Sequence, residues 1–573
     1  SRYVEFPEGH DLHFKAPYFL DVRAGEIESI EPLSLPLVAW SVDPLVKVFQ
    51  QDIVPADPNE QVNVYAARNS RKSFQVALRS LEERDVEIQI TALKNSNGVE
   101  LPVPEISKVG YVKVDYPNGY YFMPKHSDYI RFSPETPGTD GWCDLWPDPL
   151  IPVDNNSICK LQANSTQPVW FDVNVPENTA PGIYKGQVII KSDVKDIYVP
   201  VEVKVWNLLL PESRHTSVIY DLRRNLDEKI WYSFLAQYNI SPGYIRVQPK
   251  FTYENGQVSM DADEYDEQVQ FLIDELHNTM LYSPSLFRSV GWFTGAKPIF
   301  GLQPFSPEYV KAYKDAYRLF IDHITEKGWR KNFVTYLSDE PRIPLAFDAI
   351  ARVADMAREV APDVPIYVSS WRYIEEIEGH ITAWGIGAKG TFPAEIMEER
   401  QKEGDSFIYT TDGEQCLDAP FPAIERLMPW FCFKYGVRAY EFWGSTVWSY
   451  NPWEYGWHAF LDLTWEERNP VRYPNGDGYI IYPGEVIGHP GPVASIRIVA
   501  VREGVDDYEI FHALNRYAEE GNSDAKKALD RVRSLVVTPH RRGFYATKVM
   551  PDPIAVSEAR VSAGEVLDRL LGK

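Results

Sequence analysis

The period of the apolar residues changes at about residue 213, and this change constrains the fold more than any single motif does. Before it, short alternating runs such as 62–67 and 86–90 are separated by Pro, Asn and Gly clusters, a pattern typical of β-strands joined by turns. The clearest pair of runs, 182–190 and 197–205, is connected by a polar stretch that suits a hairpin loop. Residues 1–210 are therefore predicted to form a β-sandwich domain.

From about residue 213, apolar runs of strand length alternate with amphipathic helical segments. The candidate strands are 216–222, 243–247, 280–284, 332–337, 366–370, 382–387, 406–410 and 437–443. The clearest helical segments between them are 227–238, 265–278, 307–327, 346–360 and 423–435. Eight strands that alternate with helices over roughly 250–300 residues predict a (β/α)8 barrel of the TIM type. An open doubly wound sheet is the rival, but no glycine-rich phosphate loop follows any strand.

The second domain is accordingly predicted to span residues 211–573. Two further helical segments, 506–520 and 523–534, are expected to close the barrel. The multidomain fold predicted for the whole chain is thus an N-terminal β-sandwich, then a catalytic barrel, then C-terminal helices.

Charge and hydropathy exclude several classes of partner. The chain of 573 residues has a formal net charge of −24, which repels phosphate backbones and argues against a nucleic-acid partner. No apolar run approaches the ~18–20 residues of a transmembrane helix. The sequence begins with Ser1 rather than Met, which is compatible with removal of a signal peptide, so we expect a secreted or periplasmic protein, with a cytoplasmic location as the alternative.

The cysteine and histidine positions give no support to a metal or redox site. The four cysteines are Cys143, Cys159, Cys416 and Cys432, and none forms a CxxC pair. We expect buried free thiols rather than the disulfides 143–159 and 416–432. His380 and His458 have no ligand-like partner three or four residues away, so we expect no catalytic metal and no cofactor.

Two adjacent carboxylates, Asp339 and Glu340, end the apolar run 333–337, and Pro341 follows them. The run is the fourth predicted strand, so the pair would lie at the barrel mouth, where barrel enzymes carry their catalytic residues. Pro341 is expected to restrict Glu340 to an extended conformation. Neighbouring side chains on a strand face opposite ways, so both can enter one pocket only if the chain bends there. The alternative is a helix N-cap by Asp339 beside a solvated Glu340.

Aromatic residues gather near the same predicted mouth. Six of the 16 Trp fall within 430–465, around the end of the eighth predicted strand. Indole faces can stack on the C–H faces of sugar rings, although part of this segment could instead be a hydrophobic plug between the domains. The candidate substrate-binding residues at the predicted strand ends are Arg223, Trp371, Tyr373, Trp384, Tyr409, Asp412, Glu441, Trp443, Trp448 and Trp453.

An adjacent acid pair suggests a particular way of hydrolysing a glycoside. A double-displacement enzyme places its acid/base and its nucleophile on separate strands, about 5–5.5 Å apart. If the sugar carries a 2-acetamido group, however, the carbonyl oxygen of that group can attack the anomeric carbon. Glu340 would then be the acid/base, and Asp339 would orient the acetamido N–H and stabilise the oxazolinium charge. Two alternatives remain: a double-displacement glycosidase with Glu441 as nucleophile, and a non-catalytic glycan-binding protein.

Four segments resemble glycoside hydrolase family 123 and its wider clan, which carries the domain of unknown function 4091. They are 146–152, 175–186, 338–341 and 476–484, the last followed by Arg497 and 501–509. The resemblance implies the two-domain order described above. It also implies a retaining exo-β-N-acetylgalactosaminidase that acts on glycan ends by substrate-assisted catalysis, with Asp339 and Glu340 in the roles already given. The expected partner is a glycan with a terminal β-linked GalNAc.

Overall fold

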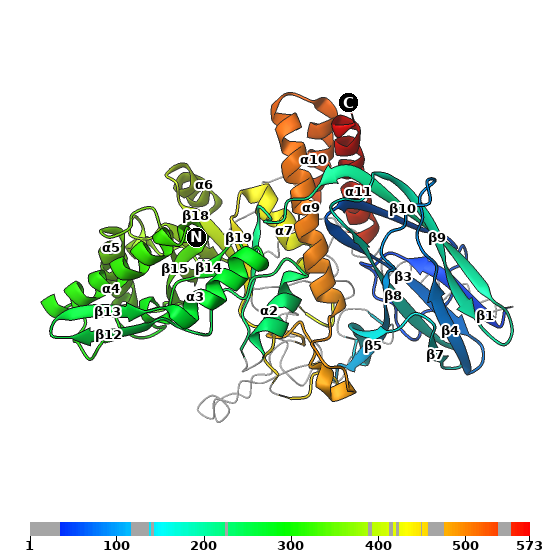
Figure 1. Cartoon of the computed structure of the whole chain (residues 1–573), viewed down its shortest axis with the longest axis horizontal. Coiled ribbons are helices and arrows are strands. Elements are labelled where there is room, and N and C mark those ends of the chain that lie inside the picture. The colour runs from blue at the N-terminus through cyan, green and yellow to red at the C-terminus, as the bar shows by residue number, and fades with distance from the viewer. Residues whose placement is uncertain are drawn as a thin grey trace.

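The molecule has two sheet-containing ends joined by a helical middle (Figure 1). The computed structural model describes residues 35–115, 137–138, 142–223, 227–387, 392–411, 416–419, 423–448, 450–456, 475–536 and 552–572. Two N-terminal sheets form one end, and a parallel sheet with its helices forms the other. The long helix α9 (Ile496–Glu519) runs between them beside α7 (Ala423–Tyr435).

The N-terminal part contains two five-stranded sheets that share one apolar core. Their strand orders are β1-β3-β8-β5-β6 and β2-β10-β9-β4-β7. The strands are β1 (Leu37–Val42), β2 (Val62–Arg68), β3 (Ser70–Ser80), β4 (Arg84–Ile90), β5 (Glu105–Lys113), β6 (Leu145–Val153), β7 (Ser157–Leu161), β8 (Ser165–Val175), β9 (Gly182–Lys191) and β10 (Ile197–Leu209). All pairings are antiparallel except that of β2 with β10. Phe74 and Phe171 from one sheet meet Tyr184 and Val203 from the other in this core, because alternate side chains on each strand are apolar.

The second half contains a seven-stranded parallel sheet, so the predicted complete (β/α)8 barrel is wrong. The sheet order is β11-β19-β18-β17-β16-β15-β14. The strands are β11 (Ser217–Tyr220), β14 (Leu281–Tyr282), β15 (Phe333–Asp339), β16 (Ile366–Trp371), β17 (Ala383–Ile386), β18 (Ser406–Thr411) and β19 (Ala439–Phe442). They correspond to seven of the eight predicted strands, and the arrangement is a half-barrel.

The missing strand is the one predicted at 243–247. Its place is taken by a turn at Pro242–Gly243, where Gly243 has a φ of +70° and Tyr244 N donates to Pro242 O at 2.8 Å. A Pro-Gly dipeptide is a strong turn signal, and it outweighs the apolar run that follows. Isolated contacts, rather than a strand, cross this gap. They include the bridge of Ile219 with Ser241 and the hydrogen bond from Tyr282 N to Gly243 O at 2.9 Å.

Helices cover the parallel sheet less regularly than a barrel requires. They are α2 (Glu228–Ala236), α3 (Asp263–Gln270), α4 (Pro307–Glu326), α5 (Pro344–Arg358), α6 (Ala394–Lys402) and α7. Only a 3-10 turn, Glu375–Ile377, lies between β16 and β17, and a hairpin of β12 (Lys250–Glu254) and β13 (Gln257–Asp261) precedes α3. The C-terminal helices are α9, α10 (Ser523–Leu535) and α11 (Pro553–Leu571). The division of the chain at residue 210 stays a prediction.

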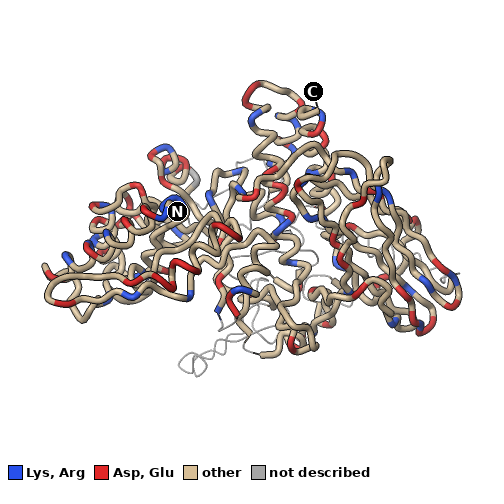
Figure 2. The backbone as a smooth tube through the Cα atoms, in the orientation of Figure 1, with Lys and Arg blue, Asp and Glu red and all other residues tan. Residues whose placement is uncertain are grey.

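The surface charge is spread over the whole molecule. Figure 2 shows acidic residues along the helices and loops of both ends, with basic residues among them. In the part of the chain that the structure describes, no helix has both the length and the apolar character that a bilayer crossing demands. Cys159, Cys416 and Cys432 are buried thiols, as expected, whereas Cys143 is only partly buried.

Buried ion pairs hold the N-terminal sheets against α9. Arg497 and Asp148 are both fully buried and lie 3.0 Å apart, and Tyr482 also donates to Asp148. A second pair joins Arg502 of α9 to Asp172 of β8 at 2.6 Å. Two of the four segments that carry the family resemblance therefore meet at this interface: 146–152, and 476–484 with its continuation to 509. Their charged residues stabilise the contact between the sheets and α9.

Replacing Arg497 with methionine should lower the free energy of unfolding by about 3–5 kcal/mol, because it leaves the Asp148 carboxylate buried without its cation. Denaturant unfolding measures this loss. The matched control is Arg531→Met, which breaks the exposed pair with Glu558 and should change stability by less than about 1 kcal/mol. Equal effects of the two substitutions would contradict the structural role of Arg497.

Candidate active site

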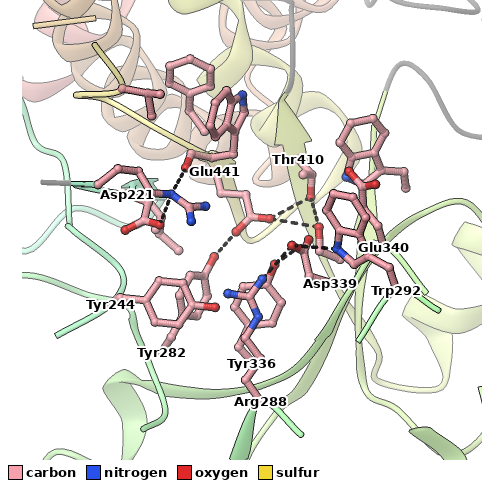
Figure 3. A pocket seen from close by; sticks show the side chains of 17 residues that line it. Asp221, Tyr244, Tyr282, Arg288, Trp292, Tyr336, Asp339, Glu340, Thr410 and Glu441 are labelled. Atoms are coloured by element: carbon pink, nitrogen blue, oxygen red, sulfur yellow. Dashed lines mark hydrogen bonds and ion pairs between the residues drawn. The ribbon is translucent and has the colours of Figure 1, made fainter. Parts of the chain in front are cut away.

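The two adjacent carboxylates line one pocket at the end of the parallel sheet. Asp339 is the last residue of β15, and the chain bends at Glu340, whose φ is +42°. The left-handed turn breaks the alternation of a strand, so both side chains reach the same pocket of about 350 Å³ (Figure 3). The expectation that Pro341 keeps Glu340 extended is therefore wrong. The Glu340 N–H donates to Ser369 O of β16 at 2.8 Å, which holds the bend in place.

Glu340 is one of two non-glycine residues at this pocket whose backbone is in the left-handed region. Trp371, at the end of the neighbouring strand β16, has a φ of +61° and also lines the pocket. A non-glycine residue in the left-handed region costs on the order of 1–3 kcal/mol, and such conformations persist mainly where surrounding contacts enforce them at functional sites. Two of them on adjacent strand ends support the choice of this pocket as the candidate site.

Three donors converge on the Asp339 carboxylate. Arg288 donates at 2.7 Å, the Tyr336 hydroxyl at 3.2 Å and the Trp292 indole N–H at 3.4 Å. The Arg288 guanidinium itself lies over the rings of Tyr336 and Tyr244, with distances of 4.6 and 5.4 Å to the ring centres. A guanidinium is always charged in proteins, so its charge-assisted hydrogen bond, together with the other two donors, holds the Asp339 side chain in one fixed orientation.

Glu340 lies closer to solvent than the residues at the pocket floor. Its carboxylate forms an ion pair with Arg342, whose side chain is 52% exposed. Water therefore reaches the outer side of this pair, whereas the inner side of Glu340 faces the pocket. A carboxyl group in this position can deliver a proton to an atom inside the pocket and exchange it with solvent.

Glu441, on β19, is the hydrogen-bonding centre of the pocket floor. Its Oε1 accepts from the hydroxyls of Tyr367 at 2.6 Å, Thr410 at 3.0 Å and Ser369 at 3.3 Å. Its Oε2 accepts from the Tyr282 hydroxyl. Burial raises the pKa of Glu441, against the opposing effect of these hydroxyls. The four hydroxyl donors occupy the lone pairs of this carboxylate and hold it in the floor of the pocket.

The wall formed by β11 and β19 carries a further carboxylate, Asp221. In Figure 3, Asp221 and Asp339 lie on opposite sides of Glu441. Arg223 Nε lies 2.9 Å from Asp221 Oδ2 and donates to Trp443 O at 3.0 Å. Burial raises the pKa of Asp221 to about 6, although Arg223 opposes that shift. The pocket therefore has hydrogen-bonding groups on both sides.

The structure brings together six of the predicted site residues and separates five others from them. The residues that line the pocket are Arg223, Asp339, Glu340, Trp371, Glu441 and Trp443. The residues that do not line it are Tyr373, Trp384, Tyr409, Trp448 and Trp453. Asp412 lies outside the described residues.

The five side chains outside the pocket have other contacts. The Trp384 N–H donates to Asp405 at 2.9 Å, and Tyr373 donates to Glu378. Tyr409 packs edge-on against the ring of Phe431. The remaining two donate to backbone carbonyls of the segment after residue 475, Trp448 to Ile481 O at 3.0 Å and Trp453 to Pro483 O at 2.9 Å. These two hydrogen bonds hold Trp448 and Trp453 against the segment after residue 475 rather than at the pocket.

Sequence reasoning missed several pocket residues. They are Ile219, Tyr244, Tyr282, Arg288, Trp292, Tyr336, Ser369, Thr410, Phe442 and Val447. Tyr282 ends the short strand β14 and could have been found from its position there. Arg288 and Trp292 lie in an irregular stretch before α4, and no periodic pattern signals them.

In the described part of the chain, one group of side chains that could hold a metal ion lies away from the pocket. Ligand atoms of His215, Glu509 and His512 are within 4.8 Å of one another. None of these residues lines the pocket. His215 shares a hydrogen bond of 2.6 Å with Glu509, and the two imidazole rings stack at 3.9 Å. The pocket itself offers carboxylates and hydroxyls that are already bonded to one another.

Two family models match most of the chain. The model described as glycoside hydrolase 123, catalytic domain, covers residues 230–514. The model described as glycoside hydrolase 123 N-terminal domain covers residues 47–192. The first range contains the acid pair and most of the pocket, and the second contains most of the N-terminal strands.

Among solved structures, the chain is similar to a family 123 glycoside hydrolase from Clostridium perfringens, studied for glycolipid glycan hydrolysis. The two are 14% identical with a TM-score of 0.67, over 94% of this chain and 99% of that one. A β-glucuronidase from Parabacteroides merdae matches with 10% identity and a TM-score of 0.24, over 72% of this chain and 48% of that one. β-Glucuronidase 3 from Bacteroides uniformis matches with 11% identity and a TM-score of 0.25, over 80% and 52%. No curated protein matches the sequence.

Proposed function

The chain belongs to glycoside hydrolase family 123, and on that premise we propose that it is a retaining exo-β-N-acetylgalactosaminidase that uses substrate-assisted catalysis. The observation that carries the proposal is the bend at Glu340, which brings two adjacent carboxylates into one pocket. An acid and a stabilising carboxylate from one dipeptide are what this mechanism needs, provided that the substrate supplies the nucleophile.

In the first step, the acetamido carbonyl oxygen attacks the anomeric carbon while the bond to the leaving oxygen breaks. Glu340 gives its proton to that oxygen. Asp339, held by Arg288, Tyr336 and Trp292, accepts a hydrogen bond from the acetamido N–H as positive charge develops. In the second step, Glu340 takes a proton from water, which attacks the anomeric carbon and opens the oxazolinium ring. Two inversions at the same carbon leave the β configuration unchanged.

The double-displacement alternative has weaker support. It requires a free carboxylate as nucleophile, and Glu441 was its candidate. The four hydroxyl donors of Glu441 occupy its lone pairs and instead suit a group that shapes the pocket floor. The pocket of about 350 Å³ lies at the small end of the usual range for ligand sites, which suits one terminal sugar.

Aryl β-glycosides of GalNAc, GlcNAc, galactose and glucose test the proposal. We expect hydrolysis of the GalNAc substrate and a rate at least about 10³-fold lower for galactose, which lacks the intramolecular nucleophile. A thiazoline derived from GalNAc, a stable mimic of the oxazoline, should inhibit at least about 10²-fold more tightly than GalNAc itself. Comparable rates on galactose and GalNAc, with no inhibition by the thiazoline, would indicate double displacement instead.

A further inference from the structure

An exposed apolar patch lies at the mouth of the pocket, next to the acid pair. Its members are Trp292, 45% exposed, Phe293, 59% exposed, and Leu345, 60% exposed. The first two lie in the loop that precedes α4, and Leu345 lies in the first turn of α5, beside Gly295 of the same loop. Trp292 lines the pocket, whereas Phe293 and Leu345 do not, so the patch continues outward from the pocket wall.

Arg342 fixes this patch relative to the catalytic pair. Its backbone N–H donates to Trp292 O at 2.9 Å. Its guanidinium lies 5.3 Å from the Trp292 ring centre and 6.0 Å from that of Phe293. The same guanidinium forms the ion pair with Glu340. The aromatic surface, the arginine and the acid are therefore one connected unit.

The patch is costly for a surface that binds nothing. A large aromatic or aliphatic side chain left in water contributes no free energy of burial to the fold. Contiguous exposed apolar groups with polar neighbours commonly mark binding sites. Cation–π contacts with Arg342 hold the rings in place, so their faces are pre-ordered for a flat partner.

We propose that Trp292 and Phe293, with Leu345, form the platform for the first sugar ring of the leaving group. This inference rests on the proposed function, because Glu340 must protonate the oxygen that joins this ring to the terminal sugar. That oxygen lies within reach of Glu340, so the ring beyond it emerges on the side where Arg342 and the patch lie. The expected occupant is a pyranose whose C–H face packs on the exposed rings, while Arg342 contacts its hydroxyls.

Two substrates distinguish the contribution of the platform to catalysis from that of the pocket. A disaccharide with a terminal β-linked GalNAc has a leaving sugar ring, whereas β-GalNAc fluoride has none. Phe293→Ala should lower kcat/KM for the disaccharide about 3- to 10-fold, the range expected for one lost ring contact, and should change that for the fluoride less than twofold. The matched control is Tyr198→Ala on β10, a similarly exposed aromatic that is 55% exposed, and both rates should stay unchanged.

Each of the remaining outcomes would contradict either the platform or the proposed function. Equal losses on both substrates, or no loss on either, would refute the platform. A loss confined to lipid-linked glycans, with free disaccharide unaffected, would assign the patch to an acyl chain and also refute it. If the wild-type protein hydrolyses neither the fluoride nor the disaccharide, this result contradicts the proposed function, on which the platform rests. Leu345→Ser gives a second variant from a different element and should show the same substrate-dependent loss.

Discussion

Replacing Glu340 with glutamine should lower kcat on an aryl or disaccharide substrate by about 10²- to 10⁴-fold, the range for loss of a general acid. Glutamine keeps the shape of the side chain but has no proton to give. The loss in kcat/KM should be much smaller for β-GalNAc fluoride, because fluoride leaves with little help from an acid. Steady-state kinetics on the two substrates measure this difference.

The fold should survive this substitution. The Glu340 side chain has Arg342 as its ionic partner, and the half-exposed arginine makes that pair worth at most about 1 kcal/mol. The matched control is Glu264→Gln, from another Asp-Glu pair of the chain, in an exposed ion pair with Lys250. Near-wild-type turnover by the Glu340 variant on the disaccharide would show that Glu340 is not the general acid.

Replacing Asp339 with asparagine should lower kcat by about 10²- to 10³-fold, with KM nearly unchanged. Asparagine can still bond to Arg288, but it carries no charge to stabilise the developing oxazolinium. The affinity for the thiazoline should fall with kcat, because the inhibitor mimics the species that Asp339 stabilises. Affinity for GalNAc itself, measured by calorimetry, should change little.

Comparing the Glu340 and Asp339 variants distinguishes the loss of one catalytic role from a general loss of structure. Glu340→Gln should retain most of its thiazoline affinity, whereas Asp339→Asn should lose it. If both variants bind the thiazoline as tightly as the wild type, Asp339 has no part in stabilising the intermediate. If both lose GalNAc binding as well, the acid pair shapes the pocket rather than carrying the chemistry.

Much of the strand arrangement followed from sequence periodicity. The runs that became β15 and β16 are short, apolar and bounded by breakers, which distinguishes strands from helices. The predicted strand at 243–247 did not form, because Pro242–Gly243 turns the chain before it. A closed barrel cannot be told from a half-barrel by counting apolar runs, since closure depends on which backbones pair.

The aromatic residues show most clearly that alternation along a strand does not always reveal which side chains face the pocket. All four residues of β17 are buried, so the alternation that tells a pocket face from a core face is lost. Trp384 was therefore placed at the mouth, although its indole N–H donates to Asp405 in the interior. Arg288 and Trp292 could not be found for a different reason: they reach Asp339 from a loop about fifty residues away, and such contacts leave no local pattern.

By itself, the sequence determined the change of architecture near residue 213, the strand that carries the acid pair, and the identity of Asp339 and Glu340 as candidates. These are properties of local periodicity and of residue chemistry. Only the tertiary structure decided that both carboxylates share one pocket. That outcome depends on the left-handed bend at Glu340, which the hydrogen bond to Ser369 of the neighbouring strand enforces against local preference.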